Sequence, residues 1–116
     1  MTGSQRRRSP RITTNQPVRL RFRGDKANVG GCLADLGWGG AYVRCSTPVE
    51  IGRQLACGFE LDNNGTRHVI RCAAEVVWVS AGDVRRTRGP GFGVRFVSTP
   101  PEVIALLKRT VGALAE

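Results

Sequence analysis

The chain has 116 residues, of which 41% are apolar and 6% aromatic, a composition that fits one globular domain with an aliphatic core and excludes global disorder. Its apolar runs are too short for a membrane span and its N-terminus lacks the apolar segment of a secretory signal, so we expect a cytoplasmic protein without membrane insertion. The net charge of +9 comes from 18 basic and 9 acidic residues. Residues 1–23 hold seven arginines and no acid, which favours an anionic, ring-bearing ligand over a merely solvated charge run.

Residues 1–15 are polar and arginine-rich, and we expect them to form a flexible N-terminal arm. Between residues 18 and 97 apolar and polar side chains alternate in short segments, the pattern of half-buried strands. The predicted strands cover residues 18–23, 29–36, 41–45, 54–61, 68–80 and 92–97. Asn63-Asn64-Gly65 predicts a hairpin turn between the fourth and fifth strands, and residues 82–90 are expected to form a loop.

In the C-terminal segment the spacing of apolar residues changes from every second residue to every third or fourth. Thr99-Pro100-Pro101-Glu102 has the spacing of a capping box with proline at the first helical position, and apolar residues follow at intervals of three and four. We therefore predict an amphipathic helix over residues 100–114. The whole pattern predicts an all-β (mainly β) fold, a six-stranded antiparallel β-barrel with one C-terminal α-helix, as a single domain over residues 16–116.

The four cysteines, Cys32, Cys45, Cys57 and Cys72, contain no Cys-x-x-Cys pair, and His68 is the only histidine. Zinc sites normally show close ligand pairs, so we expect no metal. A disulfide framework would need an oxidising compartment, and we interpret the cysteines as small buried side chains in strands. The sequence also shows no supported nucleophile–base pair, so we expect no catalytic residues, no cofactor and no enzymatic activity.

Two short stretches stand out from this background. Arg7-Arg8-Ser9-Pro10-Arg11 has an Arg-x-x-x-Arg spacing just ahead of the first strand, and Asp35-Leu36-Gly37-Trp38-Gly39-Gly40 lies at a turn between strands. Together they resemble the two signatures of PilZ domains, Arg-x-x-x-Arg followed by Asp/Asn-x-Ser-x-x-Gly. The stretches Gly40–Arg44, Val76–Val79 and Gly91–Phe96 resemble later strands of the same family, so the resemblance covers nearly the whole chain.

The resemblance implies a PilZ-type barrel that binds cyclic di-GMP, a bacterial second messenger with two guanines and two phosphates. Arginine donates bidentate hydrogen bonds to phosphate oxygens and to the O6 and N7 edge of guanine, so Arg7 and Arg11 would bind these groups of the ligand. Asp35 would accept hydrogen bonds from guanine donors, and Gly40 fits a turn where the ligand approaches the backbone. The implied ligand-binding set is Arg6, Arg7, Arg8, Arg11, Asp35, Gly37, Trp38 and Gly40. Binding would order the arm and create a surface for a protein effector.

One position departs from the family pattern, because Gly37 stands where the signature has serine. A hydrogen bond to a charged group contributes roughly 1.5–3 kcal/mol, so its loss would weaken binding about 10-fold or more. Two hypotheses follow: a cyclic di-GMP receptor, or a degenerate PilZ-like adaptor that works through protein contacts alone. A nucleic-acid polymer is an unfavoured partner because few aromatic rings are available for stacking. We expect Trp78 in the core and Trp38 partly exposed at its turn.

Overall fold

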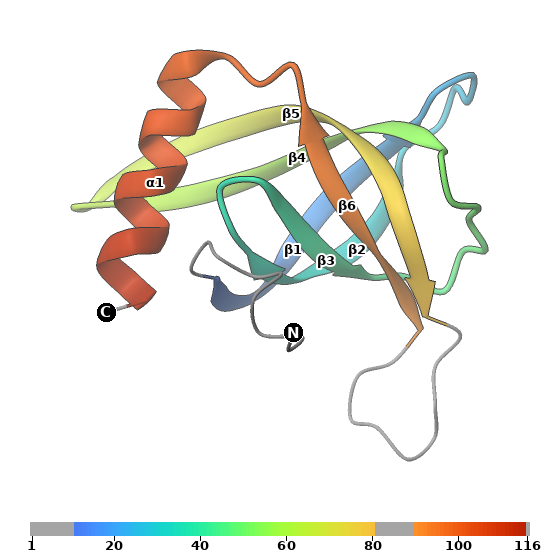
Figure 1. The fold of residues 1–116 in the computed structure, drawn as a ribbon, viewed down its shortest axis with the longest axis horizontal. Helices are drawn as coiled ribbons and strands as arrows, with labels where there is room; N and C mark the ends of the chain where they lie inside the picture. Colours follow the sequence, from blue (N-terminus) through green and yellow to red (C-terminus); the bar gives the residue numbers. More distant parts are fainter. Residues whose placement is uncertain (1–10, 81–89, 116) are drawn as a thin grey trace, which may run out of the picture.

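The computed structural model of the chain describes residues 11–80 and 90–115. They form a closed antiparallel barrel of six strands with one helix (Figure 1). The elements are β1 (Ile12–Phe22), β2 (Val29–Leu36), β3 (Gly40–Arg44), β4 (Gln54–Asn63), β5 (Thr66–Ser80), β6 (Gly91–Val97) and α1 (Pro101–Ala115). The order around the barrel is β1-β2-β3-β6-β5-β4, and pairing of β4 with β1 closes it. The predicted fold class is confirmed.

Local sequence accounts for the turns and the helix start. Asn64 and Gly65 have φ angles of 55° and 80°, as expected in a two-residue hairpin turn that suits Asn-Gly. The amide of Ile104 donates to the carbonyl oxygen of Pro100 over 3.1 Å, so Pro100 is the N-cap and Pro101 the first helical residue. The helix thus begins one residue later than the Thr99–Glu102 capping-box spacing predicts. Proline suits this position because its missing N–H would have no partner there. No helix in the described part of the chain is long and apolar enough to cross a bilayer.

The start of β1 differs from the prediction. β1 begins at Ile12, so residues 12–15, assigned to the arm on sequence alone, belong to the barrel. Ile12 pairs with Leu36 and packs against the core, and the Thr14 hydroxyl donates to the carbonyl oxygen of Leu33 over 2.5 Å. The register against β2 shifts between Thr13 and Gln16, but side chains still alternate between half-buried and exposed. Residues 13–16 are all polar, so no apolar period marks this part of the strand in the sequence. Residues 1–10 and most of the predicted loop 82–90 lie outside the described residues.

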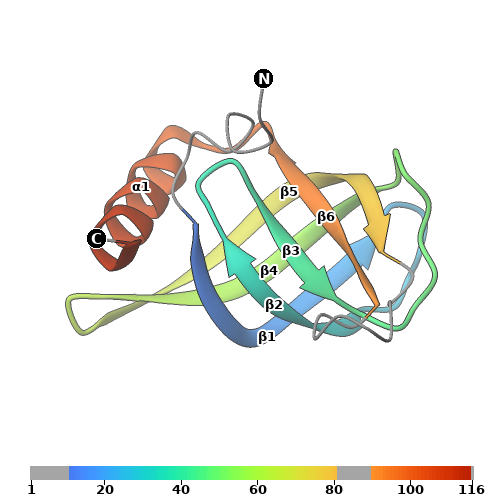
Figure 2. The ribbon, with the colours of Figure 1, turned by 60° about the horizontal axis from the view of Figure 1, so that its bottom comes forward.

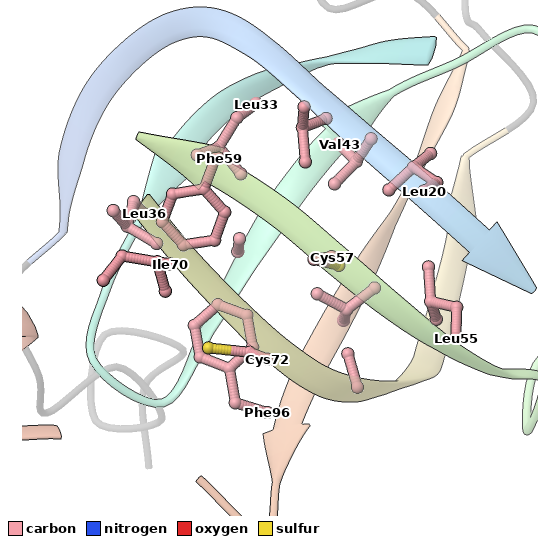
Figure 3. Close-up of a cluster of buried hydrophobic side chains, with 14 of the residues drawn as sticks. Leu20, Leu33, Leu36, Val43, Leu55, Cys57, Phe59, Ile70, Cys72 and Phe96 are labelled. Carbon is pink, nitrogen blue, oxygen red and sulfur yellow. The ribbon is translucent and has the colours of Figure 1, made fainter. Parts of the chain in front are cut away.

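The barrel interior is a continuous apolar core closed at one end by α1. Figure 3 shows side chains from several strands pointing into it, including Leu20, Leu36, Phe59 and Ile70, and each is at most 4% exposed. The helix adds its apolar stripe to this core through Leu106, Leu107 and Val111. Burial of such side chains contributes about 1.5–3 kcal/mol each, so the barrel and the helix stabilise one another.

Trp78 is not in the core, contrary to the prediction. The register of β5 against β6 shifts between Val76 and Trp78, so Trp78 pairs with Gly93 on the outer face. Its ring is 41% exposed and stacks on Tyr42 with centroids 5.1 Å apart and an interplanar angle of 19°. An extra residue in a strand turns the following side chains to the other face of the sheet. This bulge carries Trp78 outward.

The cysteines divide into two groups, and all four are free thiols. Cys57 and Cys72 face each other across β4 and β5 inside the barrel. Burial raises the pKa of Cys57 to about 12, with a smaller contribution from neighbouring Cys72, and raises the pKa of Cys72 to about 11. Cys32 and Cys45 are half-buried, and Cys45 follows the end of β3. The interpretation as buried strand residues therefore holds for Cys57 and Cys72 only.

Candidate functional site

A single row of outward-facing residues crosses five strands of the barrel. Thr13 of β1 is opposite Asp35 of β2, which is opposite Tyr42 of β3. Tyr42 is in turn opposite Gly93 of β6, which is opposite Trp78 of β5. Directly opposite residues share one face of a sheet, so this row brings together residues from the whole length of the chain. It begins beside the Arg-x-x-x-Arg motif and ends at the exposed tryptophan.

The two sequence signatures meet at an ion pair. The Nη2 atom of Arg11 lies 2.9 Å from Oδ1 of Asp35, and the two side chains are 25% and 14% exposed. The same carboxylate oxygen accepts the backbone N–H of Tyr42 over 3.2 Å. Strand pairing holds Asp35 in place and Asp35 orients the guanidinium, whose planar fork of donors suits phosphate and guanine.

The turn of the second signature is held from two sides. The Gly37 amide donates to the carbonyl oxygen of Gly40 over 2.9 Å, and the Phe96 amide donates to that of Gly39 over 2.9 Å. Gly37 is buried, and it is not among the described glycines with a positive φ. Residue types other than glycine can therefore adopt this backbone conformation, and no left-handed φ angle requires glycine there.

Trp38 and Gly40 have structural roles that the sequence did not indicate. The half-buried Trp38 ring packs against the core, and Nζ of Lys108 lies 5.6 Å above the ring centroid. Figure 2 shows that the start of β1 and the β2–β3 turn lie at the end of the barrel where α1 packs. A Cβ atom at Gly40 would overlap the carbonyl oxygen of Val94, so the close approach of β3 and β6 already requires glycine there.

The structure adds residues that sequence reasoning missed. The Tyr42–Trp78 stack lies on the same row as Asp35, and one row away Nη2 of Arg44 lies 3.2 Å from both Oδ1 of Asn15 and Sγ of Cys32. The glycine at position 93 is the sequence feature that matches the outward position of Trp78, because the indole ring lies where a Cβ of residue 93 would be. Of the predicted set, Arg11, Asp35, Gly37, Trp38 and Gly40 are described, whereas Arg6, Arg7 and Arg8 lie outside the described residues.

These observations define a small antiparallel β-barrel whose outer face carries a positioned arginine–carboxylate pair beside an aromatic stack. The chain belongs to the PilZ domain family, whose model matches residues 5–113. Domains of this family are receptors or adaptors. A search of curated proteins found no match.

Solved structures with the same fold include several PilZ proteins. The PilZ domain of Escherichia coli YcgR, solved with cyclic di-GMP, has a TM-score of 0.69 and 24% identity, and the match covers 95% of this chain and 92% of that one. The PilZ domain of CeSA from a cellulose-synthesizing bacterium has a TM-score of 0.58 and 20% identity, covering 91% and 98%. Bacillus subtilis MotI/DgrA, an inhibitor of motility, has a TM-score of 0.79 and 14% identity. That match covers 95% of this chain but only 51% of MotI.

Proposed function

We propose that this chain is a cyclic di-GMP receptor domain that signals through contacts with a protein effector. The observation that carries the proposal is the ion pair between Arg11 and Asp35. It joins the two family signatures at one point on the outer face of the barrel. A related domain of the same fold was solved with cyclic di-GMP, which supports the choice of ligand.

The ligand would lie along the row that begins at this ion pair. Arg11 would bind phosphate oxygens or the O6 and N7 edge of a guanine, and Asp35 would accept the N1–H and amino donors of a guanine. A guanine ring would stack on Trp78, which is exposed and flat against Tyr42. Arg6, Arg7 and Arg8 would add charge from the arm, which would become ordered on binding.

The proposed role involves no catalysis and no cofactor, and we place the protein in the cytoplasm. The described residues contain no group of three or more His, Cys, Asp or Glu side chains that could hold a metal ion. The site itself consists of groups that bind and orient an anion. An arginine paired with a carboxylate is always protonated, so Arg11 is suited to recognition rather than to proton transfer.

The proposal is tested by calorimetric titration of cyclic di-GMP into the purified protein, with GTP as the control ligand. We expect binding of cyclic di-GMP but not of GTP. Arg11→Gln and Asp35→Asn should each weaken binding by at least about tenfold, because each removes a charge-assisted contact of roughly 1.5 kcal/mol or more. Arg109→Gln is the matched control, since Arg109 is exposed on α1. Equal binding by all three variants would reject this site.

The second candidate function is an adaptor that does not bind the nucleotide, and Gly37 is the observation that favours it. The Gly37 φ angle is not positive, so a serine carries no left-handed strain. If the chain is a weakened receptor, Gly37→Ser should tighten binding by about tenfold or more through the restored hydroxyl. A folded Gly37→Ser variant that does not bind cyclic di-GMP at millimolar concentration would favour the adaptor function.

A further inference from the structure

A second feature of the outer surface lies away from the ion pair of Arg11 and Asp35. The outer face of β1, β4 and β5 and the start of β2 enclose a hollow of about 970 Å³. On β1 the hollow is lined from Gln16 to Arg21, whereas the signature ion pair and Thr13 lie at the start of the strand. Arg19 is six positions after Thr13, which is about 20 Å along the chain at the rise of an extended strand. The hollow is therefore a separate surface.

The middle of this hollow has a glycine floor between two arginines. Arg19 of β1 is opposite Gly58 of β4, and Gly58 is opposite Arg71 of β5. On its other side Arg19 is opposite Gly30 of β2. A Cβ at Gly58 would meet other atoms only at 3.9 Å or more, and one at Gly30 would meet none within 4 Å. The space above both glycines is therefore open to another chain.

The hollow is lined by four arginines and two acids, and this excess of positive charge favours an anionic occupant. The acids Glu60 and Asp62 lie toward the Arg67 end, where Glu60 pairs with Arg67. The positive charge is therefore concentrated at Arg19, Arg21 and Arg71.

Among the described residues, neither Arg19 nor Arg71 has a hydrogen-bond or ion-pair partner, and both are exposed. Arg21 lies two residues further along β1, opposite Ala56, and its Nη2 donates to the carbonyl oxygen of Lys26 over 2.9 Å. Arg19 and Arg21 share a face and stand about 7 Å apart along the strand. This spacing matches carboxylates at alternate positions of an extended peptide.

The lining disfavours a nucleic acid strand as the occupant. Sequence-tolerant binding of single strands relies on aromatic side chains on which bases stack. The only aromatic residue that lines the hollow is Phe59, which is 4% exposed and belongs to the core. The large exposed apolar side chain in the lining is Val69, which is 68% exposed, and it suits an aliphatic contact with a peptide.

We propose that this groove, walled by Arg19, Arg21 and Arg71 over a floor of Gly30, Ala56 and Gly58, docks an acidic, extended segment of a partner protein. The arginine forks pair with its carboxylates, and the glycines let its backbone lie close to the barrel. The inference does not depend on nucleotide binding, because the groove lies along the later part of β1, whereas the Arg11–Asp35 pair lies beside the start of that strand.

The test uses a fluorescein-labelled twelve-residue peptide of alternating Glu and Thr, with twelve-residue oligothymidylate as the comparison probe, and fluorescence anisotropy as the readout. The Arg19→Gln/Arg71→Gln double variant should bind the peptide about tenfold more weakly, as expected for two lost ion pairs. Lys26→Gln/Arg109→Gln removes the same charge from exposed residues outside the groove, and its affinity should change less than threefold. Saturating cyclic di-GMP should leave peptide binding unchanged.

A steric variant separates a shaped groove from a diffuse positive charge. Gly58→Leu keeps the net charge but fills the floor, and we expect it to weaken peptide binding about tenfold with an unchanged circular dichroism spectrum. Four results would each overturn the inference: no peptide binding at millimolar concentration, equal losses in the two double variants, full binding by a folded Gly58→Leu protein, or tighter binding of the oligothymidylate. Failure of cyclic di-GMP to bind would reject the proposed function and leave the docking groove standing.

Discussion

Two glycines shape the outer face of the barrel at the level of single residues. Gly93 leaves a gap that the Trp78 indole fills, and the ring then stacks on Tyr42. Gly40 removes a clash with the carbonyl oxygen of Val94, so that β3 and β6 can pair. At both positions the neighbouring strand can approach closely only because the residue has no side chain. The aromatic surface proposed to receive a guanine therefore depends on Gly93.

The contact between Gly93 and Trp78 gives the first prediction. Gly93→Ala should push the indole off β6, because the new Cβ would overlap the ring. Overpacking of this kind costs about 1–3 kcal/mol, so the thermal midpoint should fall and the tryptophan emission should shift to the red. Gly30→Ala is the control, since a Cβ there meets nothing within 4 Å. An unchanged emission spectrum of Gly93→Ala would show that the indole does not lie over Gly93.

Residue positions were predictable where a local pattern fixes them. The Asn63-Asn64-Gly65 turn followed from turn chemistry. The two signatures placed Arg11 and Asp35 in one ligand-binding set, but the ion pair between them was not predicted. Trp78 was misplaced because alternation alone assigns it to the core, and one extra residue in β5 reverses that assignment. The role of Gly40 was also missed, since the Val94 carbonyl that requires it is distant in sequence.

At the level of elements, α1 buries one polar group in its apolar face. Thr110 is 4% exposed, and within the described residues its hydroxyl has no hydrogen-bond partner. It lies on the same side of the helix as Leu106, Leu107 and Val111, which belong to the core. A buried hydroxyl without a partner is unfavourable because it loses its hydrogen bonds to water.

Replacement of this hydroxyl should stabilise the protein. Thr110→Val keeps the shape and the β-branch but removes the desolvated hydroxyl, so we expect the free energy of unfolding to rise by about 1 kcal/mol or more. Urea unfolding followed by circular dichroism measures the change. Thr13→Val, at an exposed position of β1, should have little effect. A destabilised Thr110→Val protein would show that the hydroxyl has a favourable interaction.

The β4–β5 pair carries a pH dependence through Cys57 and Cys72. Their thiols have pKa values of about 12 and about 11 in the folded state, against 9.0 for an unperturbed thiol. A raised pKa means that the folded state favours the protonated thiol. Stability from this source is fully present below pH 9 and is lost as the pH rises through about 11 to 12. The unfolding free energy should therefore decline above about pH 9.

The comparison variant for this decline is Cys57→Ala/Cys72→Ala. It will be less stable at every pH because of the cavities it creates, but its unfolding free energy should fall less steeply above pH 9. The other titrating groups are common to both proteins, so the difference in slope isolates the two thiols. Parallel curves in urea denaturation between about pH 8 and about pH 10.5 would rule out this contribution.

Element existence and type were predictable here, and element boundaries less so. The strands from β2 onward and α1 were placed to within about two residues, because each has a clear period of 2 or 3.6. The start of β1 was missed because residues 13–16 are all polar, although their burial alternates as in the rest of the strand. A strand segment without apolar side chains shows no apolar period in the sequence, even where strand pairing continues.

For the molecule as a whole, closure of the barrel places two candidate surfaces on the same two strands. β1 runs from the Arg11–Asp35 pair to the groove at Arg19 and Arg21, and β5 runs from the groove at Arg71 to Trp78. The pairing of β1 with β4 that completes this arrangement joins segments more than thirty residues apart. Such contacts are set by the fold and not by local pattern, which is why the groove could not be predicted from the sequence.

This arrangement predicts that ligand at one surface stabilises the whole domain independently of the other. Cyclic di-GMP at about one hundred times its dissociation constant should stabilise the folded state by about 2.7 kcal/mol. At about 4 °C per kcal/mol for a domain of this size, the thermal midpoint should rise by about 10 °C. Arg11→Gln, whose affinity should be at least about tenfold lower, should lose about half of this rise or more at the same ligand concentration, because the ligand has lost its charged partner.

The groove double variant Arg19→Gln/Arg71→Gln should keep the full rise in thermal midpoint, since both side chains lie away from the proposed ligand row. Arg19 is six positions after Thr13 on β1, and Arg71 is seven positions before Trp78 on β5. Its midpoint without ligand should match that of the parent, because exposed charges contribute little to stability. Differential scanning fluorimetry on the three proteins, with and without ligand, makes the comparison. If the groove variant also loses the rise, the nucleotide binds across both surfaces, and the assignment of separate ligand and partner sites is wrong.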